Sequence, residues 1–327
     1  RRLAHRTFTA VRERTRRSGA IAPSPVRAAG HRSWVGTGAR GEWVMTTIVV
    51  PLDGSAFAER ALRPACSLAA RLEHARVLLL SCAPDDLNVI QHRLADRAAL
   101  YSDVVHTETR LLDDEDPVGG ILTTLAAEPD AMLCMATHGG GAILANALGS
   151  VAKRVVCRST QPMVLVGPQC RTALLTAEHG RLIACSDGSA FSSIILPTAA
   201  DWCTRLQLQP WLVEVVPPDE NVESPRRPAW NREVDAATRR LTQLSPQLST
   251  PTATSAATRV LHGAPWSAIV HFAEQLPAAL IALATHGRGG LTDVLMGSIA
   301  RNVVRQAPCP VLIARPSAAT QACLESA

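Results

Sequence analysis

The sequence predicts an α/β protein with two tandem, doubly wound domains, each a five-stranded parallel sheet with helices on both faces. Three observations lead to this fold class. The chain has 327 residues, enough for about two domains. Short apolar runs alternate with amphipathic segments, as in parallel sheets. One motif occurs twice, from Ala136-Thr-His-Gly to Gly149-Ser150 and from Ala284-Thr-His-Gly to Gly297-Ser298.

The first domain shows a regular alternation of strand and helix patterns. Ser55 can cap the helix that follows the first strand, and Pro117 stands where a third helix can begin. The expected strands are Ile48–Leu52, Arg76–Cys82, Val104–Leu111, Ala131–Ala136 and Pro162–Val166. The expected helices run from Ala56 to about Leu72, from Asp86 to about Leu100, from Asp116-Pro117 to about Ala127, and from Ser150 to Arg158.

The second domain repeats this plan with one insertion. Asp53 and Asp187 are 134 residues apart, whereas His138 and His286 are 148 apart. Pro117 and Pro265 are also 148 apart, so the extra residues fall in 217–258, which we expect to be a longer excursion around one helix. The expected strands are Arg181–Ser186, Gln209–Val215, Ala257–Leu261, Ala278–Ala284 and Pro310–Ala314, and the first helix is Ala190–Leu206.

The ends of the chain differ in composition from the two domains. We expect an Arg-rich disordered extension (1–44), a first domain (45–167), a linker (168–180), a second domain (181–315) and a tail (316–327). Residues 1–44 hold ten Arg and two acids, so the formal charge of +5 becomes −3 without them. An upstream extension, a transit peptide and a nucleic-acid-binding arm all fit this segment. The mildly acidic domains give no reason to expect nucleic acid binding.

Composition excludes several other classes of protein. The apolar runs are shorter than the roughly 20 residues that span a bilayer, so we expect no membrane segment. Nine Cys occur without a CxxC pair, and several, such as Cys134, Cys157 and Cys185, lie in apolar runs. This pattern indicates reduced, buried thiols in the cytoplasm and no metal site. The P-loop motif is absent, which argues against a kinase or a nucleotide-driven motor.

Three features recur in the same order in both halves: Asp-Gly-Ser after the first strand, Thr-His-Gly after the fourth, and Gly-Ser after nine intervening residues. In a doubly wound sheet, ligands bind at the carboxyl ends of the strands, where these turns meet. Asp53 and Asp187 could accept hydrogen bonds from a ribose or hold a phosphate-bound metal. The Gly-rich turn and the helix start at Ser150 or Ser298 could hold phosphates. Each feature alone could equally be a turn or a helix cap.

These elements together resemble the universal stress protein family, in its ATP-binding branch. The resemblance rests on Ile48-Val-Val-Pro-Leu-Asp-Gly-Ser, on both Ala-Thr-His-Gly…Gly-Ser stretches, and on Pro162-Met-Val-Leu-Val and Pro310-Val-Leu-Ile, and it covers about residues 46–315. It implies strand order 3-2-1-4-5, pairing of the two fifth strands as an internal pseudo-dimer, and ATP, possibly with Mg²⁺, as the ligand. A further homodimer cannot be read from the sequence.

The resemblance also implies the residues that contact an adenine nucleotide. In the first domain these are Pro51, Leu52, Asp53, Cys82, Ala136, Thr137, His138, Gly139, Gly149, Ser150 and Val151. In the second they are Ser186, Asp187, Val215, Ala284, Thr285, His286, Gly287, Arg288, Gly297, Ser298 and Ile299. Arg288 replaces Gly140 and is either a phosphate contact or a solvated side chain.

The chain departs from the family pattern at its first Gly, which is Ala136 in one half and Ala284 in the other. The site survives this change if the backbone there keeps φ negative. His138 and His286 stand beside the expected phosphates, where they can touch the ligand or act as a general base. The sequence therefore predicts a nucleotide-binding regulatory or stress-response module. The alternatives are an interaction protein with an empty pocket and a slow ATPase.

Overall fold

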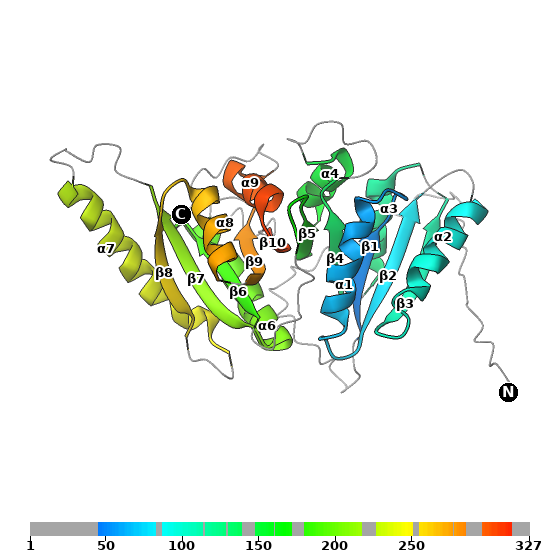
Figure 1. Cartoon of the computed structure of the whole chain (residues 1–327), viewed down its shortest axis with the longest axis horizontal. Helices are drawn as coiled ribbons and strands as arrows, with labels where there is room; N and C mark the ends of the chain where they lie inside the picture. Colours follow the sequence, from blue (N-terminus) through cyan, green and yellow to red (C-terminus); the bar gives the residue numbers. More distant parts are fainter. Residues whose placement is uncertain are drawn as a thin grey trace, which may run out of the picture.

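The structure is a computed structural model, which describes residues 45–82, 87–113, 115–128, 130–138, 148–159, 161–171, 180–217, 227–250, 255–276, 278–285 and 296–315. Its strands form one ten-stranded sheet in the order β3-β2-β1-β4-β5-β10-β9-β6-β7-β8 (Figure 1). Each half is a parallel sheet of order 3-2-1-4-5, as expected. The limits proposed for the domains and the linker stay predictions.

The described residues of the first half form five strands that alternate with a 3-10 turn and four α-helices. Its strands are β1 (Thr46–Pro51), β2 (Ala75–Cys82), β3 (His106–Leu112), β4 (Ala131–Ala136) and β5 (Met163–Val166). Its helices are the 3-10 turn η1 (Ala58–Ala61), α1 (Leu62–Ala69), α2 (Leu87–Ala99), α3 (Pro117–Ala127) and α4 (Ser150–Arg158). Asp116 caps α3 by accepting the N–H of Val118 at 3.2 Å, and Pro117 takes the first helical position.

The second half repeats this order with a longer second helix. Its strands are β6 (Arg181–Ser186), β7 (Gln209–Val216), β8 (Ala257–His262), β9 (Ala278–Ala284) and β10 (Val311–Ala314). Its helices are α5 (Ala190–Ser193), α6 (Ile195–Leu206), α7 (Arg227–Leu244), η2 (Ser245–Leu248), α8 (Pro265–Gln275) and α9 (Ser298–Gln306). Within its described residues, the predicted excursion at 217–258 contains the helix α7 and the short 3-10 turn η2.

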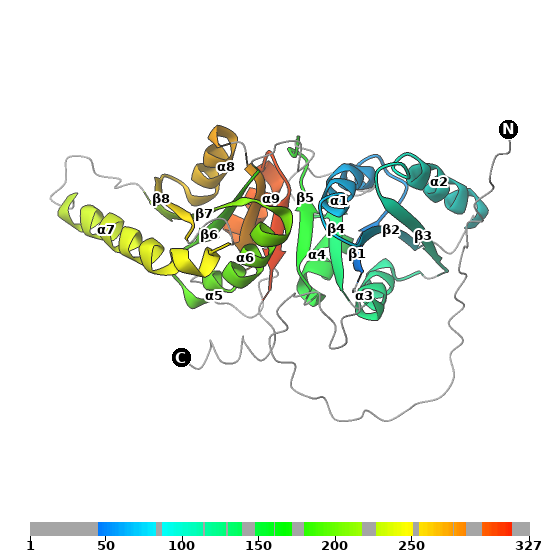
Figure 2. The same ribbon diagram turned by 90° about the horizontal axis from the view of Figure 1, so that it is seen from below.

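Helices cover both faces of the sheet and bury a separate core on each (Figure 2). Neighbouring residues of a strand point to opposite faces, so Val50 belongs to one core and Val49 to the other. The first core packs against α1, α2, α6 and α7, and the second against α3, α4, α8 and α9. Within the described ranges, no helix is long and apolar enough to cross a membrane.

The two halves join where β5 and β10 pair antiparallel, with Val164 opposite Leu312. This confirms the expected pairing of the fifth strands. Because these two strands run in opposite directions, β5 and β10 end at opposite edges of the sheet. Gly167 packs so closely that a Cβ there would lie 1.9 Å from the Val304 carbonyl oxygen. Glycine is therefore required at this end of the junction.

A polar cluster also ties the halves together at the amino-terminal edge of the first sheet. Arg205 of α6 donates through Nη2 to the Thr46 hydroxyl at 2.7 Å. The same Nη2 lies 3.7 Å from Asp130, and Thr46 donates to Asp130 at 2.5 Å. The Arg205 Nη1 atom lies 3.8 Å from Asp201 on the preceding turn of α6.

Several expected boundaries are wrong, for local reasons. The first helix of each half is shorter or broken: η1 precedes α1 in the first, and α5 is separated from α6 in the second. In the second half, Ser192 and Ser193 both donate their hydroxyls to the Ser189 carbonyl, which competes with regular helix formation. The third strand begins at His106, because Val104 and Val105 close the turn after α2.

The cysteines that the structure describes are free thiols, and most are buried. Cys134 and Cys185 are buried as expected, and burial raises the pKa of both thiols. Burial raises the pKa of Cys66 to about 12. Cys157 is only partly buried, contrary to the expectation, because its face of α4 is open to solvent.

Candidate functional site

The three repeated features come together where connections from neighbouring strands lead to helices on opposite faces of the sheet. β1 pairs with β4, and β6 pairs with β9, so the turns that follow these strands are neighbours. The chain leaves β1 toward α1 on one face, and α4, which follows β4, packs on the other face. Such a divergence opens a crevice beyond the strand ends, which is where doubly wound folds bind ligands. β6 and β9 repeat this arrangement.

The Asp-Gly-Ser turns are closely similar in the two halves. The Asp53 Oδ1 atom accepts the Ser55 N–H at 2.9 Å, and Asp187 Oδ1 accepts the Ser189 N–H at 3.0 Å. The intervening glycines, Gly54 and Gly188, have φ of 78° and 79°, a conformation that favours glycine. Ser55 accepts the Ala58 N–H at 3.1 Å where η1 begins, but the N-cap positions of η1 and α1 are Phe57 and Ala61, so the expected cap at Ser55 is not confirmed. Each aspartate thus stands at the strand end with its backbone fixed.

The helix starts at Gly149 and Gly297 form a second matched pair. Each N–H donates at 2.8 Å to the carbonyl of the threonine after the fourth strand, Thr137 or Thr285. A Cβ at these glycines would lie 3.0 Å and 3.3 Å from those oxygens. Among the described residues no side chain caps α4 or α9, since both N-cap residues are glycines. The N–H groups of a first turn of this kind can bind an anion.

Thr137 and His138 connect β4 to the expected phosphate loop. Thr137 is buried, and its N–H donates to the Val166 carbonyl at 3.0 Å. Its hydroxyl oxygen lies 2.9 Å from Nδ1 of His138. The other ring nitrogen, Nε2, is buried and has no hydrogen-bond partner in the described part of the chain. A buried polar atom of this kind normally has a partner, and a ligand in the crevice could supply one.

The remaining predicted contacts divide between the two faces. Cys82 packs toward α3, where a Cβ at Gly120 would meet its Sγ at 2.8 Å, and Val215 packs against the same core on its side. Pro51 is half-buried and Leu52 is buried. Ser186 turns inward, and its hydroxyl accepts the Gly188 N–H at 3.1 Å. Ser150, Val151, Ser298 and Ile299 begin helices α4 and α9. Gly139, His286, Gly287 and Arg288 lie outside the described residues.

Ala136 and Ala284 each end a strand, β4 and β9. Among the described residues other than glycine, only His74 and Gln207 have positive φ. Both alanines therefore keep the negative φ that the sequence analysis required, and their methyl groups cause no backbone strain.

Sequence reasoning missed two arginines near the Asp-Gly-Ser turns. A Cβ at Gly54 would lie 2.5 Å from Nη1 of Arg93, and one at Gly188 would lie 2.7 Å from Nε of Arg240. Arg93 comes from α2 and Arg240 from α7, so the second helix of each half supplies the arginine. An arginine on an amphipathic helix looks like a solvated side chain, and the insertion before α7 hides the correspondence. No signal in the sequence could have found this pair.

Comparisons with known proteins agree with this architecture. Residues 179–315 match the Universal stress protein family. A universal stress protein of Methanocaldococcus jannaschii is 45% identical over 58 residues, 18% of this chain and 34% of that protein. One from Mycobacterium tuberculosis is 26% identical over 186 residues, 57% of this chain and 62% of that protein. The matched part of this chain therefore spans about a third of the length of the first relative and somewhat under two thirds of the length of the second.

Among solved structures, a functionally unknown protein of Pseudomonas aeruginosa superposes with a TM-score of 0.55 at 16% identity, covering 86% of this chain and 95% of that one. This likeness concerns the fold. The molecule is thus a pair of doubly wound α/β domains with matched turns at the strand ends. The family match places the second half further: residues 179–315 belong to the universal stress protein family. The first half repeats the fold of the second, so the chain has the architecture of a tandem universal stress protein.

Proposed function

We propose that this protein binds ATP at the carboxyl ends of the strands, in one or both halves, and acts as a nucleotide-dependent regulatory or stress-response module. One observation carries the proposal. In both halves, a fixed Asp-Gly-Ser turn and a Gly-Ser helix start follow neighbouring strands, at the point where the connections lead to opposite faces of the sheet. A nucleoside phosphate requires both a hydrogen-bond acceptor for its ribose hydroxyls and a nearby site that binds its anionic phosphates.

The two parts of the crevice would take different parts of the nucleotide. Asp53 and Asp187 would accept hydrogen bonds from the ribose hydroxyls, beside Pro51, Leu52 and Cys82 in the first half. The N–H groups that begin α4 and α9 would hold the phosphates, with His138 Nε2 as a further donor or acceptor. Mg²⁺ would accompany the phosphates and offset their charge.

The direct test is equilibrium binding of Mg²⁺–ATP to the full chain by isothermal titration calorimetry. Gly149→Val and Gly297→Val would each push a side chain against the threonine carbonyl at a helix start, and each should remove one site. Thr204→Ala, an exposed change on α6, is the control and should bind as the wild type does. Retention of full stoichiometry in the double Gly→Val variant would refute the assignment of the site.

A further inference from the structure

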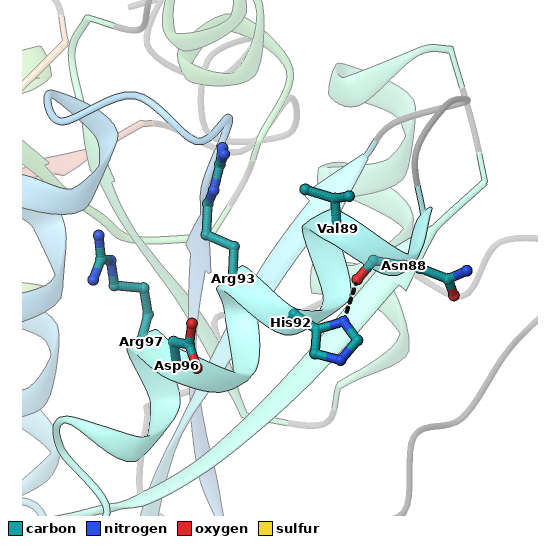
Figure 3. A pocket seen from close by; sticks show the side chains of 6 residues that line it. All are labelled: Asn88, Val89, His92, Arg93, Asp96 and Arg97. Atoms are coloured by element: carbon teal, nitrogen blue, oxygen red, sulfur yellow. Dashed lines mark hydrogen bonds between the residues drawn. The ribbon is translucent and has the colours of Figure 1, made fainter.

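Arg93 is an exposed cation held beside the candidate pocket of the first half. It lines a hollow of about 600 Å³ over α2, together with Asn88, Val89, His92, Asp96 and Arg97 (Figure 3). Its side chain is directed away from Asp96 and toward the turn after β1, where Nη1 reaches Gly54. Within the described ranges Arg93 makes no hydrogen bond or ion pair. Arg97, one turn later, instead donates to Glu59 at 2.7 Å.

Arg240 has the same place in the second half, but its guanidinium is engaged. Its Nε donates to Glu214 at 3.2 Å, and its Nη2 donates to the other oxygen of the same carboxylate. Glu214 lies on β7 and is 2% exposed. This two-point contact fixes the planar group and neutralises its charge.

Strand register shows what corresponds to Glu214 in the first half. Pro51 is opposite Leu80, and its counterpart Cys185 is opposite Val213. The next residues along these strands are Ser81 and Glu214, so the first half has a small hydroxyl where the second has a carboxylate. Arg93 is therefore left without the buried acid that holds Arg240.

The turn of the second half is also closed by serine side chains. The Ser192 hydroxyl accepts the Asp187 N–H at 3.2 Å, and Ser186 accepts the Gly188 N–H at 3.1 Å. The Ser189 hydroxyl donates to Asp187 Oδ1 at 2.6 Å. In the first half, the counterparts of Ser186 and Ser192 are Leu52 and Ala58, whose side chains cannot accept hydrogen bonds. The serine contacts that close the second turn therefore have no side-chain equivalents in the first.

The position of Arg93 indicates which part of the ligand it would meet. Helix α2 packs on the same face as α1, whereas α4, with the expected phosphate site, packs on the opposite face. A guanidinium over Gly54 is therefore next to the ribose and base. Arginine stacks on the face of an aromatic base, and the charge strengthens this contact.

We propose that Arg93 is a specificity-determining residue that covers the adenosine part of the nucleotide in the first half, and that Glu214 withholds Arg240 from the same role. The two halves then bind adenine nucleotides with unequal affinity, and the first half is the tighter site. This inference rests on the proposed function, since it concerns the same pockets.

The test uses calorimetric titration of the full chain with one site closed at a time. In the Gly297→Val background, Arg93→Gln should raise the Kd about tenfold, equivalent to about 1.4 kcal/mol. The factor should be the same for ATP, ADP, AMP and adenosine, because the contact is with the part they share. Arg97→Gln is the matched control on the same helix and should leave the Kd unchanged. The Kd of Arg93→Lys should lie between those of the wild type and Arg93→Gln, because lysine keeps the positive charge but lacks the planar guanidinium group.

In the Gly149→Val background, Glu214→Ser gives the second half the residue of the first and should tighten binding several-fold. Melting curves check that this variant folds. An Arg93→Gln effect that shrinks from ATP to adenosine would place the arginine on the phosphates and overturn the inference. So would an unchanged Kd in Arg93→Gln while the wild type binds. If the wild type binds no adenine nucleotide, that result refutes the proposed function, and with it this inference.

Discussion

Asp201 makes the stability of this protein depend on pH in a way that can be measured. Its carboxylate lies on α6 near the junction, and 22% of its side chain is exposed. The Oδ2 atom is buried without a hydrogen-bond partner in the described part of the structure, and Arg205 Nη1 is 3.8 Å away. Burial raises the pKa of Asp201 from 3.8 to about 6, and the Arg205 charge offsets only part of this effect.

The size and sign of the effect follow from these pKa values. The change from 3.8 to about 6 corresponds to about 3 kcal/mol. Because the folded-state pKa of an acid is raised, the ionised group opposes folding above pH 6. The penalty falls as the pH drops from about 6 to about 4, where the folded protein binds a proton before the unfolded chain does. Through this group alone, the protein becomes more stable with acidification in that window.

Asp201→Asn should remove the effect. Urea unfolding at pH 7, 6, 5 and 4, at constant salt, gives the free energy of unfolding of both proteins. At pH 7 the variant should be more stable by up to about 3 kcal/mol, and at pH 4 the two should agree. Asp103→Asn, at an exposed position, is the control for loss of one carboxylate. A variant that is less stable at pH 7, or a difference that persists at pH 4, would refute this account of Asp201.

Three other predictions test the site, the junction and a second charge cluster. Saturating ATP, at about 100 times its Kd, should stabilise the wild type by about 2.7 kcal/mol per site, and Gly149→Val should lose one such contribution in thermal melts. Leu165→Ala, at a fully buried position of β5, should cost about 2–5 kcal/mol by urea unfolding; a change under 1 kcal/mol would contradict the packing at the junction. Burial disfavours ionised Glu128, but hydrogen bonds and charge from Arg110 and Arg76 outweigh it and lower its pKa below 4.5. This contribution is present at neutral pH and is lost as the pH falls below 4.5, so Glu128→Gln should destabilise at pH 7, and urea unfolding should show the difference from the wild type shrinking as the pH falls below 4.5.

The sequence predicted most of the fold because the evidence for each element is local and occurs twice. Apolar runs mark the strands, and Asp116-Pro117 and Pro265 mark helix starts that the structure confirms. The resemblance to the family rested on the repeated motifs, and the match of residues 179–315 agrees with it. The resemblance in turn implied the β5–β10 pairing, which the structure confirms. Helix ends were less accurate, since serine side chains near Ser189 interrupt the regular helix pattern.

The chain by itself determined that there are two matched sets of Asp-Gly-Ser and Gly-Ser elements, because these are short stretches with fixed spacing. Only the tertiary structure decided how the two sets differ. Arg93 and Arg240 reach their turns from helices whose sequence positions do not align, and Glu214 meets Arg240 only because α7 packs against β7. The Thr46–Asp130–Arg205 cluster likewise joins residues far apart in the chain. Contacts of this kind depend on how packed elements place side chains in space, which local sequence patterns do not encode.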